Sequence, residues 1–291
     1  MFFKDTFFSK NRSLNCNGKL LDLSTPKVMG ILNVTPDSFY DGGKYDSTDK
    51  ILKKIKCMIR EGANIIDVGG LSTRPGSEPV SEKEEINRII PAISLIRDHF
   101  PGTIISVDTY RANVARTVVK DYSVELVNDI SGGEMDKNMF ETIADLRIPY
   151  IFMHMKGSPL TMQTQTKYED ILTEILDYFA SRIDRLRVLG LNDIVIDPGF
   201  GFSKSIEQNF YLLNRLDTFH IFELPIMVGI SRKSMIYRTL KSEPSGSLNG
   251  TTVLNTVALL KGADILRVHD VKEAMQTITL MEKLKTLKIS D

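Results

Sequence analysis

The sequence predicts an α/β protein, a single (β/α)8 TIM barrel with a short N-terminal extension. Short apolar runs alternate with helical patterns along the chain, and eight of these runs have the length of a strand. The runs are apolar at nearly every position, as expected for parallel strands with both faces buried. One strand and one helix together take about thirty residues, the usual size of a βαβ unit. Eight units favour closure into a barrel, although spacing alone does not exclude an open sheet.

The predicted elements follow one another in strict alternation. The strands are predicted at residues 28–33, 64–68, 104–108, 125–128, 149–153, 194–197, 225–229 and 264–268. The helices are predicted at 47–61, 82–98, 111–120, 136–145, 168–189, 205–215, 233–240 with 250–261, and 270–286. The region 168–189 illustrates the helical pattern, because Ile171, Ile175, Phe179, Ile183 and Leu186 recur at intervals of three or four residues.

The chain divides into a short extension and one barrel domain. Residues 1–26 precede the first predicted strand, and we expect them to form a small hairpin or a cover over the barrel floor. Residues 27–291 form the barrel, since no linker interrupts the alternation. Polar loops at Thr35–Ser47 and Leu71–Ser81 follow the first two strands, so they belong over the active face. A third polar loop, Lys156–Lys167, is rich in Thr and Gln.

Composition argues against several partners. Lys+Arg and Asp+Glu both total 37, so no net field favours nucleic acid or an anionic membrane. A small anionic ligand must therefore be held by locally placed Arg and Lys. The two cysteines, Cys16 and Cys57, form no CxxC motif, which favours a reducing cytoplasm. No apolar run approaches the roughly 20 residues that span a bilayer, and Met1–Ser13 lacks the pattern of a signal peptide.

Polar and charged residues gather just after the predicted strands. In a parallel barrel the carboxyl ends of the strands carry the active site, so these residues describe one shared pocket. The runs are NVTPD at 33–37, DVGG at 67–70 with STRPG at 72–76, VDT at 107–109, DPGFGF at 197–202 and SRKS at 231–234.

Asp197 is the strongest candidate in this pocket. Pro198 biases it away from helical backbone, and Gly199 and Gly201 allow close backbone approach. A carboxylate here can accept two hydrogen bonds from a planar donor pair, such as the 2-amino-pyrimidinone edge of a pterin or guanine. The alternative is a turn or N-cap aspartate. Asn128 and Asp108 also end strands, where they could bind a heterocycle edge or cap the next helix.

Basic residues follow the seventh and eighth strands, where such barrels commonly bind anions. Lys233 could donate to a carbonyl or ring nitrogen, and Arg232 and Arg267 are either anion ligands or salt-bridge partners. His269 lies close to Arg267, so it is either a phosphate contact or a structural histidine. His154 is best read as a buried ring bonded to backbone.

Two further features concern a flat ring and a metal. Met153 and Phe202 are suited to form apolar walls for a flat ring. The amide oxygen of Asn33 could ligate Mg²⁺, with phosphate oxygens and water completing the ligand set. The sequence has no zinc motif, no Ser–His–Asp elbow and no GxGxxG fingerprint.

Taken together, these motifs resemble the dihydropteroate synthase family. The resemblance runs from about residue 20 to 285, in order and with the family's spacing. It is carried by MGILNVTPDSF at 29–39, DVGG at 67–70, STRPG at 72–76, VDT at 107–109, NDI at 128–130, MHMKG at 153–157, DPGFGF at 197–202, SRKS at 231–234 and RVHD at 267–270.

The resemblance implies a reaction: 6-hydroxymethyl-7,8-dihydropterin diphosphate and 4-aminobenzoate give 7,8-dihydropteroate and pyrophosphate, with Mg²⁺ as cofactor. It implies a homodimer formed through late helices. By matching position, the pterin would be held by Asp108, Asn128, Met153, Asp197, Phe202, Gly229 and Lys233. The diphosphate would be held by Asn33 through Mg²⁺ and by Thr73, Arg74, Arg267 and His269. The 4-aminobenzoate site would comprise Phe39, Thr73, Pro75, Lys233 and Ser234. Catalysis would depend on Asn33, Asp41, Arg74, Asp108 and Lys233, with Asp41 ordering the loops over the leaving group.

The sequence departs from the family's pattern at two positions, and two alternative functions are open. The family usually has glutamate where this chain has Leu71, and serine where it has Tyr40. One alternative is a methyltetrahydrofolate methyltransferase domain, which would need a corrinoid partner and would give Arg74 and Arg267 no purpose. The other is a non-catalytic pterin-binding paralogue, which the presence of Arg74 and Asp41 in the loops argues against.

Overall fold

The eight predicted strands form one parallel barrel. The computed structural model describes residues 13–35, 44–71 and 80–286. Its barrel strands are β3 (Lys27–Asn33), β4 (Ile65–Gly69), β5 (Ile104–Asp108), β6 (Leu126–Asp129), β7 (Tyr150–Met153), β8 (Ile194–Asp197), β9 (Met227–Val228) and β10 (Ile265–Val268). They pair in the order β8-β7-β6-β5-β4-β3-β10-β9, and every pair is parallel. A bridge between Ile196 and Ile226 joins the two ends of this order.

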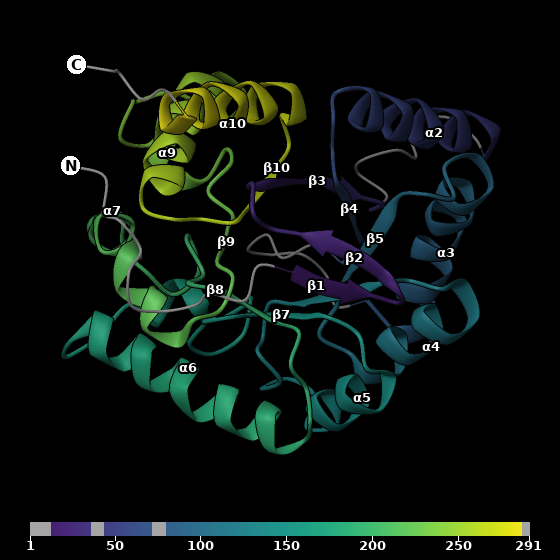
Figure 1. Ribbon diagram of the computed structural model, residues 1–291, viewed down its shortest axis with the longest axis horizontal. Helices are drawn as coiled ribbons and strands as arrows, with labels where there is room; N and C mark the ends of the chain where they lie inside the picture. Colours follow the sequence, from purple (N-terminus) through teal and green to yellow (C-terminus); the bar gives the residue numbers. More distant parts are fainter. Residues whose placement is uncertain (1–12, 36–43, 72–79, 287–291) are drawn as a thin grey trace.

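Helices surround the strands as an outer ring (Figure 1). They are α2 (Lys44–Arg60), α3 (Glu82–His99), α4 (Ala112–Tyr122), α5 (Met139–Leu146), α6 (Ile171–Val188), α7 (Ile206–Asn214), α8 (Ser234–Tyr237), α9 (Leu248–Leu260) and α10 (Val271–Thr286). Short 3₁₀ turns are η1 (Met162–Thr164), η2 (Leu216–Phe222) and η3 (Pro244–Gly246). None of the helices in the described ranges combines the length and apolar character needed to cross a membrane.

The predicted strands and helices match the observed ones within a few residues, with two local differences. The seventh strand, predicted at 225–229, is only the two-residue β9. The predicted helix at 233–240 shortens to the four-residue α8. Both differences adjoin residues 229–233, which belong to neither a strand nor a helix. Arg232 in this segment has a positive φ of 56°. The altered backbone brings Lys233 to the mouth of the barrel.

An antiparallel hairpin, β1 (Ser13–Cys16) with β2 (Lys19–Asp22), covers the amino ends of the barrel strands. Its buried side chains pack against one residue from each barrel strand. This floor layer comprises Leu14, Cys16, Leu21 and Leu23 with Met29, Ile65, Ile104, Leu126, Ile151, Val195, Met227 and Ile265. Burial of these apolar groups closes the barrel at this end, opposite the predicted site.

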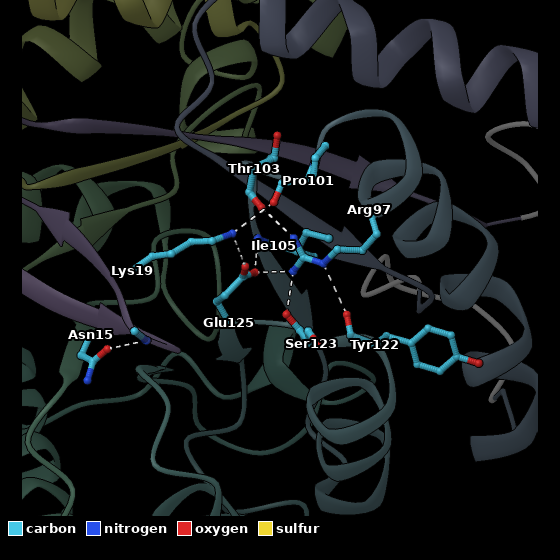
Figure 2. A network of polar contacts seen from close by, with 10 residues as sticks. Asn15, Lys19, Arg97, Pro101, Thr103, Ile105, Tyr122, Ser123 and Glu125 are labelled. Atoms are coloured by element: carbon cyan, nitrogen blue, oxygen red, sulfur yellow. Dashed lines mark hydrogen bonds and ion pairs between the residues drawn. The ribbon is translucent and has the colours of Figure 1, made fainter.

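Glu125 ties the hairpin to the floor through a polar network (Figure 2). Its carboxylate is 3% exposed and accepts from Arg97, from Lys19 at 3.2 Å and from the Ile105 backbone N–H at 2.9 Å. Arg97 also donates to the carbonyl oxygens of Thr103 and Ser123 at 2.9 and 2.7 Å. Two of these partners are cations and the third is a backbone N–H, so groups of the chain itself compensate the buried negative charge of Glu125.

Candidate active site

Strand periodicity places the predicted site residues inside the barrel. Side chains along a strand alternate between its faces, so residues two or four positions beyond the floor layer also point inward. This rule places eight residues above the floor, one from each strand: Asn33, Asp67, Asp108, Asn128, Met153, Asp197, Gly229 and Arg267. The register supports the arrangement, because Asp108 pairs with Asn128, and Gly69 lies between Asn33 and Asp108. Seven of these eight are residues that the sequence singles out, and they come to the same end of the barrel, while their roles toward substrate stay predictions.

Arg267 is the centre of this site. Its Nε donates to Asp67 Oδ2 at 2.7 Å and its Nη2 donates to Asp108 Oδ2 at 2.6 Å. The amide of Asn128 also donates to Asp67 Oδ2, at 3.1 Å. Asp67 is fully buried, while Asp108 and Arg267 are 16% and 18% exposed. The guanidinium thus bonds two carboxylates from two other strands, and Asp67 links Asn128 to it.

Burial sets the protonation of this cluster. Loss of hydration raises the pKa of Asp108 to about 7, which Arg267 opposes and the negative charge of Asp67 reinforces. The two carboxylates keep Arg267 protonated, since their charges raise its pKa against the effect of burial. Asp108 is consequently an acid whose charge changes near neutral pH.

Asp197 combines a turn contact with a carboxylate oxygen left for a ligand. It is 4% exposed, and its Oδ1 accepts from the Gly199 backbone N–H at 2.8 Å. Among the described residues nothing donates to Oδ2. Burial raises the pKa of Asp197, while the nearby charge of Lys233 lowers it. The turn reading of Asp197 is therefore confirmed, while its role toward a planar donor pair stays a prediction that Oδ2 leaves room for.

Lys233 faces Asp197 from the segment after β9. Its Nζ donates to the Phe200 carbonyl and lies 4.6 Å from the centre of the Phe202 ring. Burial lowers the pKa of Lys233 to about 8, and the charge of Asp197 works in the opposite direction. Gly229 lies beside the side chains of Lys233 and Arg267. A Cβ added to Gly229 would lie 3.9 Å from Lys233 Nζ and 3.8 Å from Arg267 Cβ. The Lys233 ammonium group therefore lies by the Phe202 ring, and the Asp197 charge is close enough to affect its pKa.

An apolar cluster lies beside these polar groups. Met153, which is 2% exposed, packs with Ile130, Met155 and Met162, and Phe202 lies against this cluster. Met153 and Phe202 therefore lie in one apolar cluster, and their role as walls for a flat ring stays a prediction.

The loops after β9 and β10 are joined by two polar contacts. Ser231 Oγ lies 3.1 Å from His269 Nδ1 and accepts from the His269 backbone N–H at 3.2 Å. Burial, and then Arg267, lower the pKa of His269 to about 4, so the ring is neutral at physiological pH. Arg232 forms a two-point ion pair with Asp270 at 2.9 and 2.6 Å, which makes it a salt-bridge partner here. Ser234 begins α8 directly after Lys233.

Asn33 fits the metal role only in combination with other ligands. An added Cβ on Gly69 would lie 3.3 Å from Asn33 Oδ1 and 3.4 Å from Asp108, so this amide oxygen lies at the rim of the polar cluster. The described residues contain no group of three or more His, Cys, Asp or Glu suited to a metal. An amide with one nearby carboxylate suits Mg²⁺ that retains water and phosphate ligands.

Five predicted residues lie outside the described ranges. They are Phe39, Asp41, Thr73, Arg74 and Pro75, and the departure at Tyr40 joins them. The other departure, Leu71, is partly buried at the end of the described segment 44–71.

Two residues with contacts to the candidate site received no role from the sequence reasoning. Asp67 holds both Arg267 and Asn128, and Lys204 is a buried cation directly behind the segment that carries Asp197 and Phe202. Asp67 stands in the DVGG motif two positions beyond Ile65, so strand periodicity alone could have found it. Lys204 gave no comparable signal, because a lysine in a loop is usually exposed.

Comparisons with known proteins place this site in context. A family profile described as pterin binding enzyme matches residues 29–269. Dihydropteroate synthase of Escherichia coli strain K12 is 44% identical over 94% of this chain and 97% of its own length. The Haemophilus influenzae enzyme of the same name is 42% identical over 89% and 94%.

Solved structures agree with these relatives. Yersinia pestis dihydropteroate synthase in a sulfonamide complex superposes with a TM-score of 0.88 and 40% identity, covering 94% of this chain and all of that one. The Xanthomonas albilineans enzyme with 4-aminobenzoic acid gives a TM-score of 0.88 at 34% identity, over 95% and 99%.

Proposed function

The chain belongs to the dihydropteroate synthase family of pterin binding enzymes, and from this premise we propose how its barrel residues divide the work. It is a transferase of folate biosynthesis. It joins 6-hydroxymethyl-7,8-dihydropterin diphosphate to 4-aminobenzoate, and 7,8-dihydropteroate and pyrophosphate leave. The match extends over 94% of the chain, which disfavours both the methyltransferase and the non-catalytic alternatives.

The pterin is held by the groups that converge above the floor layer. The observation that carries this assignment is buried Asp197, whose Oδ2 accepts from no described residue and whose pKa the nearby charge of Lys233 lowers. The donor pair of the 2-amino-pyrimidinone edge binds this carboxylate, while Asn128 and Asp108 bind the remaining ring edge. Met153 and Phe202 cover the faces of the ring.

The diphosphate lies toward Arg267 and His269. Arg267 uses the N–H of Nε and one N–H of Nη2 on two carboxylates, and its Nη1 donates to no described residue, so three of its five N–H donors remain for phosphate. Thr73 and Arg74 join these ligands from the loop between β4 and α3, outside the described ranges. Arginine suits this role because its planar fork matches phosphate oxygens.

Asn33 would hold Mg²⁺ at the diphosphate site through its amide oxygen, which lies close to Asp108. When bound, the metal would offset negative charge on the pyrophosphate group.

The chemistry then needs no strong base. Departure of pyrophosphate leaves a methylene cation that the electron-rich dihydropterin stabilises, and the aromatic amine adds to it. Lys233 and Asp197 orient the ring, while Phe39, Asp41, Pro75 and Ser234 shape the arylamine site and help exclude water from the cation. This explains why no nucleophilic Ser or Cys is required.

The assembly and location follow the family. A homodimer forms through the late helices, and the protein works in the cytoplasm, where its free cysteines Cys16 and Cys57 stay reduced. Light scattering coupled to size-exclusion chromatography tests the dimer, and cell fractionation tests the location.

A coupled pyrophosphate-release assay tests the function. Release is expected only when both substrates and Mg²⁺ are present, and EDTA should abolish it until excess Mg²⁺ is restored. Release that ignores 4-aminobenzoate would indicate simple hydrolysis, and no release with a protein that binds the pterin would overturn the synthase assignment.

A further inference from the structure

Lys204 is a buried cation that the reaction as described does not use. It is 7% exposed and follows β8 by seven residues. Its Nζ lies 3.0 Å from the carbonyl oxygens of both Gly199 and Phe202. It also lies 3.0 Å from His154 Nδ1 and 3.3 Å from the His154 carbonyl oxygen. One ammonium group therefore joins the segment after β8 to the end of β7.

A positive charge at this buried position loses its hydration, which costs free energy. Within the described ranges no carboxylate lies at ion-pair distance from Lys204 Nζ, so carbonyl dipoles and a ring nitrogen supply its compensation. Burial lowers the pKa of Lys204 to about 7, which the charge of Asp197 opposes. Burial likewise lowers the pKa of His154 to about 2, so its ring is neutral and Nδ1 can accept.

The two segments that Lys204 joins pack so closely that no side chain beyond the hydrogen of Gly199 fits between them. Gly199 has a φ of +76°, and an added Cβ would lie 2.0 Å from the His154 carbonyl oxygen. The Gly199 N–H orients Asp197 Oδ1 at 2.8 Å, while its carbonyl accepts from Lys204. The Phe202 carbonyl is held in the same way, and Met153 directly precedes His154. Lys204 thus reaches Asp197 through Gly199, bonds the backbone of Phe202 directly, and bonds His154, the residue next to Met153.

We propose that Lys204 is a positioning residue whose ammonium group fixes the orientation of Asp197 and the spacing of Met153 and Phe202, and so sets affinity for the pterin substrate. This inference rests on the proposed function. A deprotonated amine has two N–H donors instead of three, so loss of the proton leaves one fewer donor for the four acceptors around Nζ.

Other charged groups face Lys204, and their titration must be separated from its own. Lys156 lies on the β7 side, Asp197 on the β8 side and Lys233 on the β9 side. Lys233, with its pKa lowered to about 8, also titrates above neutrality. A lysine-to-methionine change at position 204 removes only the Lys204 contribution, so the difference between two pH profiles isolates it.

The test compares Lys204→Met with the wild type and with Lys156→Met, a nearby lysine that pairs with Glu174. KM for the pterin diphosphate and kcat are measured from pH 6 to 9. In the wild type this KM is expected to rise as pH passes about 7. In Lys204→Met it should be raised about tenfold already at pH 6, without that rise, as expected for lost bonds to a charged group. Lys156→Met should keep the wild-type KM at pH 6, and the rise should move to higher pH, because the charge of Lys156 helps to lower the pKa of Lys204.

Two results would overturn the proposal. One is a folded Lys204→Met whose pterin KM stays within twofold of wild type with an unchanged pH profile. If this variant fails to fold, Lys204→Gln, which keeps neutral N–H donors, replaces it, and a wild-type profile there is equally contrary. Calorimetric titration with the pterin diphosphate tests the same affinities without turnover. A wild type that binds the pterin but releases no pyrophosphate would refute the synthase function alone.

Discussion

At the scale of single residues, Asp67 shows how one buried carboxylate organises a site. Its Oδ2 accepts from Arg267 and from Asn128, two residues that come from strands on either side of it in the barrel. Breaking a buried ion pair by removing one partner is costly, because the other charge stays behind uncompensated. Asp67 therefore aligns the side chains of Arg267 and Asn128.

Asp67→Asn is expected to change both affinity and pH dependence. The negative charge of Asp67 helps raise the pKa of Asp108 to about 7, so its removal should lower that pKa. If ionised Asp108 accepts from the pterin ring, wild-type affinity falls as pH drops below about 7, and in the variant this fall moves to lower pH. Calorimetry with the pterin diphosphate from pH 5 to 8 measures it. Asp98→Asn, an exposed change of the same kind, is the control; an unshifted Asp67→Asn profile would contradict the coupling.

Asp197→Asn should weaken pterin binding while the fold survives. The substitution keeps the shape but replaces a charged acceptor by an amide, and a hydrogen bond to a charged group contributes roughly 1.5–3 kcal/mol. Affinity should fall about ten- to a hundred-fold. Calorimetry together with circular dichroism checks both parts, and unchanged affinity in a folded variant would refute the assignment.

At the scale of elements, the barrel has a stable end and a reactive end. The hairpin β1–β2 and the Glu125 network close the amino ends of the strands, away from the substrate groups (Figure 2). Polar groups at the floor have their hydrogen-bond partners within the chain, whereas those at the other end keep free donors and acceptors. This division separates stability from catalysis along the same strands.

Arg97→Met is expected to lower stability without changing substrate affinity. It removes a cation from buried Glu125 and leaves the carbonyls of Thr103 and Ser123 without this donor. The free energy of unfolding should fall by about 3 kcal/mol. Arg185→Met, which breaks an exposed pair with Glu141, should change it by less than about 1 kcal/mol. Urea denaturation measures both, and equal losses would show that the floor network adds no stability.

At the scale of the whole molecule, the candidate site draws on several strands and on the segments that follow them. The polar cluster comes from β4, β5, β6 and β10, and the apolar cluster comes from Met153 on β7 and from the segments after β6 and β7. Further predicted ligands lie outside the described ranges. A pocket built in this way can hold one substrate before the second is recognised.

Binding is expected to be ordered for this reason. 4-Aminobenzoate should bind measurably only when pyrophosphate, Mg²⁺ and a 6-hydroxymethylpterin already occupy the site. Calorimetric titration of 4-aminobenzoate with and without these preloaded ligands tests the order. Tight binding to the ligand-free protein would show that the arylamine site forms independently.

The sequence by itself determined the elements and the direction in which their side chains point. The apolar runs at 104–108 and 194–197 became β5 and β8 with the same bounds, and the two-residue period placed Asp108 and Asp197 inward. These properties depend on local spacing, which a single chain displays directly. The predictions for Phe39, Asp41, Thr73, Arg74 and Pro75 remain predictions.

Only the tertiary structure decided which groups meet. Arg267 pairs with Asp67 across 200 positions of sequence, and Lys204 contacts His154 across 50. Both contacts arise because barrel closure brings distant strands into one small space, where a buried charge must find compensation wherever a donor or acceptor lies. No local pattern encodes such a pairing, so the partners of Arg267 and the role of Lys204 became visible only in the folded chain.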